Sequence, residues 1–150
     1  MDEKKKKHRF DLFEERCRQQ GIPCTVQRRA VLDIILDSDH HPTTDQVFDV
    51  VRDRVPGISR TTVYRTLETL VRMDIITKTC HPGSAVRYDP RVEIHHHLVC
   101  LYCDDVIDID SEQLNLLPVP DTSKEEFDVF DFRVQLRGIC RNCKKKEVER

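Results

Sequence analysis

Through roughly the first eighty residues, apolar positions recur every three to four residues, the spacing that gathers them on one side of an α-helix. Residues that commonly begin or end helices separate these stretches. Thr25, Thr43 and Ser59 each stand at a predicted helix start, and Gly21 stands just after a predicted helix end. We therefore expect four helices in this part of the chain.

The third and fourth predicted helices are separated by a short turn that contains Pro56 and Gly57. The fourth helix buries an apolar stripe and turns a polar, partly basic side outward, made of Arg60, Thr61, Thr62, Tyr64, Arg65 and Glu68. Such a side on a helix that follows a short turn is typical of a recognition helix in the major groove of DNA. The candidate DNA contacts are Arg60, Thr61, Tyr64 and Arg65.

Two short strands are expected after the fourth helix, in "IITKTC" (residues 75–80) and "AVRYD" (residues 85–89), with a turn from His81 to Ser84 between them. Helices followed by a β-hairpin are the element order of a winged helix-turn-helix. We therefore predict a winged-helix DNA-binding domain over residues 1–89.

Beyond Asp89 the pattern changes to short stretches that alternate between apolar and polar residues. Strands are expected at residues 96–100, 105–110 and 127–138, and a short helix at 111–117. Pro118 and Pro120 prevent that helix from continuing, and the charged tail at 144–150 is expected to fray. The predicted class is α+β, with a small α/β dimerisation domain over residues 90–150.

Charge and composition change this picture little. Residues 1–80 hold 15 Lys and Arg against 13 Asp and Glu, whereas residues 81–150 hold 10 against 14. A basic front half and an acidic rear half suit two separate tasks, although an asymmetry of this size also arises by chance. No run of eighteen apolar residues and no apolar stretch after the charged start is present, so we expect a cytoplasmic protein with no membrane partner.

Four of the seven cysteines form two Cys-x-x-Cys pairs, Cys100 with Cys103 and Cys140 with Cys143. In a reducing compartment, such pairs are metal ligands or redox thiols more often than structural disulfides. Each pair turns two thiolates toward one ion, and two pairs complete the tetrahedral ligand set of a closed zinc site. We predict a structural Zn²⁺ here, with reversible oxidation of the thiols as the alternative.

Three consecutive histidines precede the first of these pairs. Because side chains alternate across a strand, His95 and His97 share one face and His96 points to the other. Asp108 and Asp110 share a face of the next predicted strand in the same way. Nitrogen and oxygen ligands suit an exchangeable Fe²⁺, Mn²⁺ or Zn²⁺. The alternative is that these polar side chains simply face solvent. For His96, a place on the surface and a specific role are equally open.

Four segments together resemble the ferric-uptake regulator (Fur) family of metal-responsive repressors, namely "HHPTTDQVFDVV", "PGISRTTVYRTLETL", "HHHLVCLYC" and "GICRNC". The resemblance spans roughly residues 10–143. It implies a transcriptional repressor and not an enzyme, with a winged-helix domain, a dimerisation domain that holds the four-cysteine zinc, and a regulatory metal at the hinge. It also implies a homodimer that binds a palindromic operator in double-stranded DNA.

The resemblance implies five ligands for the regulatory metal, and all five are present: His41, Asp89, His95, His97 and Asp108. They match the peroxide-sensing (PerR-like) branch. Iron sensors usually carry glutamate at the positions of Asp89 and Asp108, and zinc sensors usually carry cysteine at that of Asp89. We therefore predict a repressor that binds Fe²⁺ or Mn²⁺ and responds to peroxide through metal-catalysed oxidation of His41 or His95. The alternatives are an iron-responsive repressor of metal uptake and, more remotely, a metallohydrolase.

Some positions depart from the family pattern. The last predicted strand contains "VFDFRVQL", without the histidine that completes a second metal site in many relatives, so no such site is expected. Arg65 stands where peroxide sensors often carry asparagine, which favours an operator closer to that of iron regulators. The residues left without an assigned role are Cys17, Cys24, Cys80, His81 and His96. We expect the first two to be buried thiols and the next two to belong to a turn.

Overall fold

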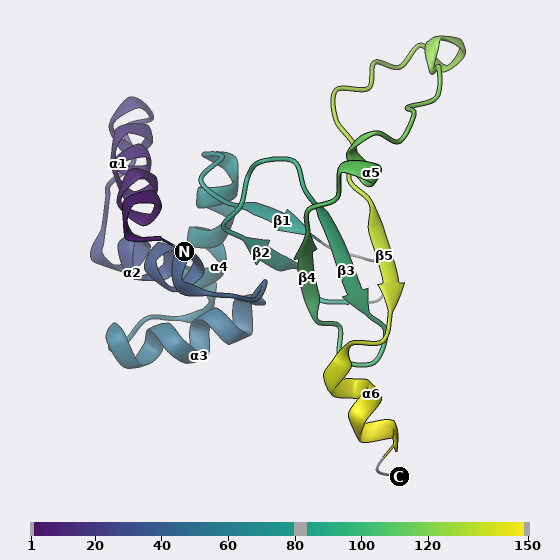
Figure 1. Cartoon of the computed structure of the whole chain (residues 1–150). Coiled ribbons are helices and arrows are strands. Elements are labelled where there is room, and N and C mark those ends of the chain that lie inside the picture. The colour runs from purple at the N-terminus through teal and green to yellow at the C-terminus, as the bar shows by residue number, and fades with distance from the viewer. Residues whose placement is uncertain (1, 80–83, 149–150) are drawn as a thin grey trace. The chain divides into compact units, whose positions relative to one another are not determined.

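The computed structural model describes residues 2–79 and 84–148. The chain divides into two compact units, Met1–Val92 and Glu93–Arg150, which we call unit 1 and unit 2. Unit 1 is mainly helical, and unit 2 is built on a small sheet (Figure 1). The predicted α+β class is confirmed.

Among the described residues of unit 1, four helices precede a two-stranded hairpin. The helices are α1 (Glu3–Gln19), α2 (Val26–Asp37), α3 (Thr44–Arg54) and α4 (Arg60–Arg72), and the strands are β1 (Thr77–Thr79) and β2 (Arg87–Asp89). The strands pair antiparallel, with Thr77 opposite Asp89. Most of the turn expected between them, and with it the expected roles of Cys80 and His81, lies outside the described residues.

The helix starts follow the local signals in the sequence. The Thr25 side chain accepts a hydrogen bond from the Arg28 N–H at the start of α2, and Ser59 caps α4 in the same way. At α3, the Thr43 hydroxyl accepts from the Gln46 N–H, and the Gln46 side chain accepts from the Thr43 N–H at 2.8 Å. This reciprocal capping box satisfies two N–H groups that a helix start otherwise leaves without intrahelical partners. All three predicted caps are confirmed.

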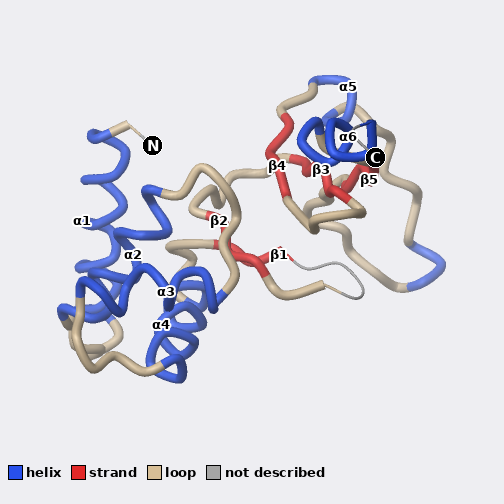
Figure 2. The backbone as a smooth tube through the Cα atoms, turned by 90° about the horizontal axis from the view of Figure 1, so that it is seen from below, coloured by secondary structure: helices blue, strands red, loops and turns tan. Residues whose placement is uncertain are grey.

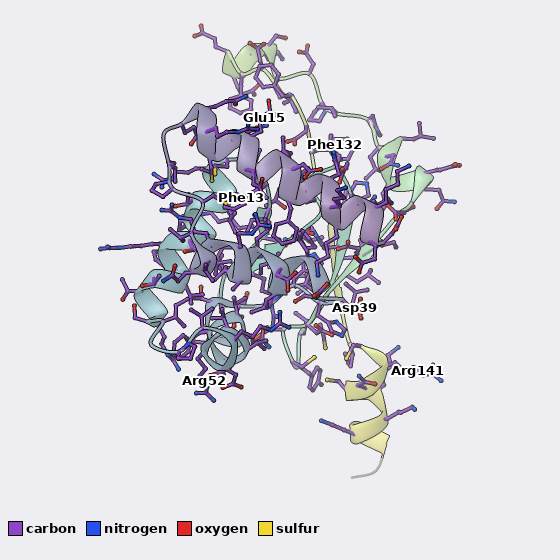
Figure 3. All side chains as sticks on the ribbon, turned by 90° about the vertical axis from the view of Figure 1, so that its left-hand side faces the viewer. Phe13, Glu15, Asp39, Arg52, Phe132 and Arg141 are labelled. Atoms are coloured by element: carbon purple, nitrogen blue, oxygen red, sulfur yellow. The ribbon has the colours of Figure 1, made fainter. Side chains whose placement is uncertain are left out.

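The core of unit 1 collects the apolar faces of its helices and the residues around its hairpin. Its buried members are Phe13, Cys17, Val31, Leu32, Ile34, Ile35, Leu36, Val47, Val51, Val63, Leu67, Leu70, Met73, Ile75, Ile76 and Tyr88. Phe13, labelled in Figure 3, projects from α1 and has no exposed surface. Full burial of one such side chain contributes about 1.5–3 kcal/mol relative to exposure, so this cluster holds the helices and the hairpin together.

The loop before α3 is tied to β2 by backbone and side-chain hydrogen bonds. The Tyr88 N–H donates to the carbonyl of Pro42 at 3.0 Å. The Arg87 guanidinium donates to the carbonyl of His41 at 2.8 Å. These bonds bring His41 beside Asp89 within unit 1.

Unit 2 is built on a three-stranded sheet with the order β4-β3-β5. The strands are β3 (His96–Cys100), β4 (Val106–Ile109) and β5 (Gln135–Gly138). β3 pairs antiparallel with β4 and parallel with β5, with Cys100 opposite Gly138. The other elements are α5 (Glu112–Asn115), the 3₁₀ helix η1 (Ser123–Glu125) and α6 (Arg141–Val148), all drawn by type in Figure 2.

The strand predicted over residues 127–138 is wrong for most of its length. Only Gln135–Gly138 forms β5, and residues 127–134 have no regular structure. The apolar residues that suggested a strand are largely exposed, with Phe127 at 65% and Phe130 at 94%. Alternation predicts a half-buried strand only where a partner strand and a covering layer exist, and among the described residues the ladder with β3 begins only at Gln135.

Within the described residues, the charged tail is helical up to Val148 and does not fray as expected, and residues 149–150 lie outside the described part of the chain. Its lysines belong to α6, which begins at Arg141, directly after Cys140. Lysine and glutamate are good helix formers, and Lys145 and Lys146 lie in the last turn, where cations favour the helix dipole. The helix expected at 111–117 is confirmed as the single turn α5. Within residues 2–79 and 84–148, no helix is long and apolar enough to cross a membrane.

Candidate metal centres

The two Cys-x-x-Cys pairs meet at one end of the unit 2 sheet. Cys100 is the last residue of β3, and Cys140 follows β5 by two residues. Because β3 and β5 run parallel, their ends lie side by side, and the Leu101 N–H donates to the Gly138 carbonyl at 2.8 Å. The parallel pairing therefore brings both Cys-x-x-Cys pairs to the same end of the sheet.

The four sulfurs have the spacing of a tetrahedral zinc site. The Sγ atoms of Cys100, Cys103, Cys140 and Cys143 all lie within 4.8 Å of one another. Cys103 Sγ and Cys140 Sγ are 3.8 Å apart. Thiolates about 2.3 Å from one Zn²⁺ in a tetrahedron lie about 3.8 Å from each other. The cysteines predicted as a closed zinc set are thus brought together, and their geometry and chemistry fit that ion.

The protonation of this cluster also favours a cation. Burial raises the pKa of Cys100, but backbone N–H groups, including that of Cys140 at 3.3 Å, outweigh it and lower the pKa to about 6. Hydrogen bonds that the Cys143 S–H donates to Cys103 and Cys140 raise the pKa of Cys143 to about 12. One thiolate thus forms readily while another thiol keeps its proton. Full ionisation of all four requires a positive ion in their centre.

Two of the consecutive histidines face one carboxylate within unit 2. His97 lies opposite Asp108 in the pairing of β3 with β4. The Nε2 atoms of His95 and His97 are 3.3 Å and 3.7 Å from Asp108 Oδ1. Both rings are buried, and their centroids are 4.6 Å apart. The predicted alternation therefore brings His95, just before β3, and His97, on β3, to Asp108 on β4.

One hydrogen bond sets the tautomer of His95. Its Nδ1 lies 2.7 Å from the carbonyl oxygen of Glu93, which can only accept, so Nδ1 carries the proton. In the neutral ring, Nε2 then turns a lone pair toward Asp108. A lone pair and a carboxylate oxygen face each other favourably only with a cation between them, either a proton or a metal ion. Ligands about 2.1 Å from one ion at right angles lie about 3 Å apart, close to the separation observed.

A second His and carboxylate pair lies in unit 1. His41 Nε2 is 3.2 Å from Asp89 Oδ2, and both side chains are almost completely buried. Asp89 Oδ1 accepts a hydrogen bond from the Arg91 N–H at 2.7 Å, which orients the carboxylate. The bonds that tie β2 to the loop before α3 hold His41 in place. Ligand atoms that are oriented in this way are typical of metal sites.

His96 does not face solvent, so the surface interpretation is wrong. Its ring is fully buried and stacks on Phe132, with centroids 6.0 Å apart. The Val134 N–H donates to its Nδ1 at 3.1 Å, so Nε2 carries the proton and donates to Asn115 Oδ1 at 2.9 Å. Both ring nitrogens are used, and His96 joins β3 to α5 and to the segment before β5. Nothing local in the sequence points to Asn115 or Val134 as its partners.

The candidate DNA contacts lie on the outer side of α4. Arg60, Thr61, Tyr64 and Arg65 are exposed there, opposite the buried stripe of the helix. Arg60 is held by an ion pair with Asp45 and lies 5.1 Å from the centroid of the Phe48 ring. Tyr64 is 51% exposed. This side of α4 combines hydroxyls, a phenol and two guanidinium groups, the donors that bind phosphates and base edges.

The family model described as "Ferric uptake regulator family" matches residues 19–137. A curated relative, the "Peroxide-responsive repressor PerR" of Staphylococcus aureus (strain Mu50 / ATCC 700699), is 31% identical over 129 residues, which are 86% of this chain and 87% of that protein.

Solved structures give the same fold. The Helicobacter pylori ferric uptake regulator Fur superposes with a TM-score of 0.78 at 19% identity, over 93% of both chains. A zinc-bound manganese uptake regulator superposes with a TM-score of 0.67 at 29% identity, over 85% of this chain and 97% of that one. Family members are dimeric DNA-binding transcriptional regulators and not enzymes. Since the family model covers most of the sequence, the chain belongs to the ferric uptake regulator family.

Proposed function

We propose that this protein is a metal-dependent transcriptional repressor that releases its operator when peroxide oxidises a ligand histidine. The observation that carries the proposal is the composition of the two His and carboxylate groups. The histidines are buried, and the carboxylates are Asp89 and Asp108, without the glutamate or cysteine of iron and zinc sensors. The relatives from Staphylococcus aureus that are named peroxide-responsive support the same function.

The four-cysteine cluster is proposed to hold a structural Zn²⁺. The ligands would be Cys100, Cys103, Cys140 and Cys143, and the ion would clip the end of β3 to the start of α6. A site with four protein ligands has no open position for a substrate, so its role is to hold unit 2 together.

The regulatory ion is proposed to be Fe²⁺ or Mn²⁺ bound by both His and carboxylate groups. His41 and Asp89 would come from unit 1, and His95, His97 and Asp108 from unit 2. Each group is already assembled within its own unit, so binding would not require either unit to refold. An ion with ligands from both units restricts the angle between them, and hence the spacing of two recognition helices on a palindromic operator.

Peroxide sensing is proposed to act through the ligands themselves. A bound Fe²⁺ would activate hydrogen peroxide next to its ligands. One oxygen atom of the peroxide would be inserted at a ring C–H of His41 or His95 and the other would leave as water, so that the imidazole is oxidised by two electrons and the peroxide is reduced by two. The Nδ1 bond to Glu93 would hold the His95 ring in place during this step. An oxidised ring binds metal more weakly, and the restraint on the two units is lost.

DNA recognition is proposed for the outer side of α4. Arg60, Thr61, Tyr64 and Arg65 would contact base edges and phosphates, one α4 from each protomer of a homodimer entering each half of the operator. The exposed placement of these four residues supports this role. The repressor would act on its operator in the cytoplasm.

The decisive experiment loads the protein with Fe²⁺ or Mn²⁺ and treats each form with hydrogen peroxide. The Fe²⁺ form is expected to lose operator binding and to gain one oxygen atom on the peptide that contains His41 or His95. The Mn²⁺ form is expected to keep both its mass and its affinity. Oxygen gained only on cysteines, or an equal response with Mn²⁺, would sink the proposal.

Two carboxylate variants sharpen this experiment. Asp108→Glu should still repress with metal but lose much of its response to peroxide, because the longer carboxylate changes how the ligands enclose the ion. Asp110→Glu makes the same change at an exposed residue just beyond β4 and should respond like the unchanged protein. Equal behaviour of the two variants would count against Asp108 as a ligand.

The alternative is an iron-responsive repressor of metal uptake that is indifferent to peroxide. Arg65, exposed on α4, is the residue that favours it. Operator binding by the Fe²⁺ form that survives peroxide treatment, with no oxidised histidine, would establish this alternative.

A further inference from the structure

Two cysteines outside the candidate metal centres meet where α1 turns into α2. Gly21 ends α1 with φ +64°, a left-handed conformation that costs glycine little. The Ile22 N–H donates to the carbonyl of Cys17 at 2.9 Å, and the Gly21 N–H to that of Arg18 at 3.3 Å. These two bonds form a Schellman motif, which folds the chain back on the last turn of the helix. Cys24 is thereby returned to the side of α1 that carries Cys17.

The two thiols differ sharply in their surroundings. Cys17 is 2% exposed and belongs to the core of unit 1, whereas Cys24 is exposed, against the expectation that both would be buried. Both line one cavity of about 630 Å³ together with Glu14, Arg18, Gly21 and Arg29. A cavity of this volume lies within the range of small-molecule sites, roughly 300–1,000 Å³. The pair thus has one accessible sulfur, one sheltered sulfur and space for a small molecule.

A guanidinium group lies at the same cavity as the two thiols. The Arg29 side chain lines it and is anchored there by an ion pair with Glu14 and by the Phe10 ring, 5.2 Å away. Burial is the main reason that the pKa of Cys17 is raised, and the neighbouring Cys24 thiol raises it further. The exposed Cys24 sulfur is the one that a small disulfide can reach from solvent, so Cys24 is suited to react first and the sheltered Cys17 to act second.

We propose that Cys17 and Cys24 form a reversible disulfide in exchange with low-molecular-weight disulfides of the glutathione type. The Cys24 thiolate attacks one sulfur of the small disulfide, which releases one small thiolate and leaves a mixed disulfide on Cys24. Cys17 then loses its proton and attacks the Cys24 sulfur, which releases the second small thiolate. Two protein thiols are oxidised to one disulfide, and one small disulfide is reduced to two thiols.

The proposed site makes unit 1 responsive to the thiol balance of the cell, separately from any metal. Carboxylates on the small disulfide are attracted by Arg18 and Arg29 at the cavity. The new bond links the last turn of α1 to the segment just before α2, which is already folded against it. Small thiols reverse the oxidation by the same exchange reaction.

The test treats the full-length reduced protein with oxidised glutathione, blocks remaining thiols and digests it with trypsin without reduction. Trypsin cleaves after Arg16, Arg18 and Arg28, and the cut after Arg18 separates the two cysteines, so a disulfide appears as two linked peptides. We expect the Cys17–Arg18 dipeptide joined to residues 19–28, with the loss of two hydrogens. Failure to find it, with Cys24 either fully alkylated or carrying only glutathione, would overturn the proposal.

Two serine variants distinguish the roles of Cys24, which reacts first, and Cys17, which reacts second. Cys17→Ser should stop the reaction at the mixed disulfide, so that glutathione accumulates on Cys24. Cys24→Ser should leave Cys17 reduced. Because Cys24 is exposed, this variant keeps the core intact and keeps the test valid if Cys17→Ser folds poorly.

Arg29→Gln should slow disulfide formation several-fold. Arg52→Gln, an exposed arginine on α3 outside the cavity, is the matched control and should leave the rate unchanged. Equal rates for the two arginine variants would remove the proposed role of the cavity.

Discussion

Unit 1 and unit 2 are each stabilised internally in a different way. Unit 1 has a continuous apolar core to which all of its helices contribute. Of the buried apolar residues in the described chain, only Val99, Cys100 and Val106 belong to unit 2. Unit 2 instead exposes many large apolar side chains, namely Ile94, Leu98, Leu101, Tyr102, Ile107, Leu116, Leu117, Val119, Phe127, Val129, Phe130 and Leu136.

This difference shows what each unit needs in order to stay folded. A unit as small as Glu93–Arg150 buries too little apolar surface to offset the entropy of ordering its chain, and such units commonly rely on metals or on oligomerisation. The four-cysteine cluster and the exposed apolar residues supply the means for both. Unit 1 needs neither. The contrast agrees with membership of a family of dimeric regulators.

The largest expected effect follows removal of a cysteine ligand. Structural Zn²⁺ in small domains contributes on the order of 10–16 kcal/mol of apparent binding free energy. Cys103→Ser should therefore lose zinc and unfold unit 2 while unit 1 stays folded. Zinc analysis together with amide NMR signals assigned to each unit measures this. Cys24→Ser removes a thiol outside the cluster and should keep the zinc. A zinc-free Cys103→Ser protein with a folded unit 2 would show that the sheet stands without the ion.

A core truncation in unit 1 comes next. Leu67 is fully buried in α4, and Leu67→Ala should lower the free energy of unfolding of unit 1 by about 2–5 kcal/mol through lost burial and the cavity left behind. Denaturant titration measures the loss, and the zinc content should not change. Val50 on α3 is 45% exposed, so Val50→Ala should stay within about 0.5 kcal/mol. Similar losses for the two variants would contradict the idea of a self-sufficient core.

Dimerisation should depend on the exposed apolar residues of unit 2. Phe130→Ser removes the most exposed of them and should raise the dimer Kd about tenfold or more, which corresponds to about 1.4 kcal/mol or more. Sedimentation equilibrium measures the Kd. Val26→Ser removes a residue that is 73% exposed in unit 1, and this control should leave the Kd unchanged. An unchanged Kd for Phe130→Ser would place the dimer contact elsewhere.

The smallest effect is expected at the buried histidine. Asn115→Ala deprives the His96 Nε2–H of its acceptor and should destabilise unit 2 by about 1 kcal/mol. The loss stays small because a cavity of about 440 Å³ lined by His96, Asn115 and Phe132 can admit water. Thermal unfolding followed by circular dichroism measures it. Asn115→Asp keeps an acceptor oxygen and should cost less. A larger loss with aspartate would mean that the assigned tautomer is wrong.

Local signals in the sequence were enough to predict unit 1. Each N-cap at Thr25, Thr43 and Ser59 lies within three residues of the N–H groups that it satisfies, so the signal and the structure occupy the same short segment. The Cys-x-x-Cys pairs are equally local, and chemistry alone required the two pairs to meet.

Errors arose where structure depends on distant partners. Residues 127–134 alternate like a strand, but a strand also needs a neighbour to pair with, and the parallel pairing with β3 covers only Gln135–Gly138. His96 was left without an assigned role because its partners, Asn115 and Val134, lie 19 and 38 residues away in the sequence. Cys24 was expected to be buried and is exposed, because the turn at Gly21 places it at the surface beside the end of α1.

The parallel pairing of β3 with β5 obliges the chain to travel back along the sheet before it can form β5. This return path carries β4, α5, η1 and most of the exposed apolar residues. Its ends lie at Cys103 and Cys140, and the residues between them include no cysteine of the cluster. Insertions and substitutions between α5 and β5 can change which copy a protomer recognises without altering Asp108 on β4 or the four cysteines. Such changes leave Cys100, Cys103, Cys140 and Cys143 in place, so that the choice of partner and the binding of a metal by these cysteines can change independently.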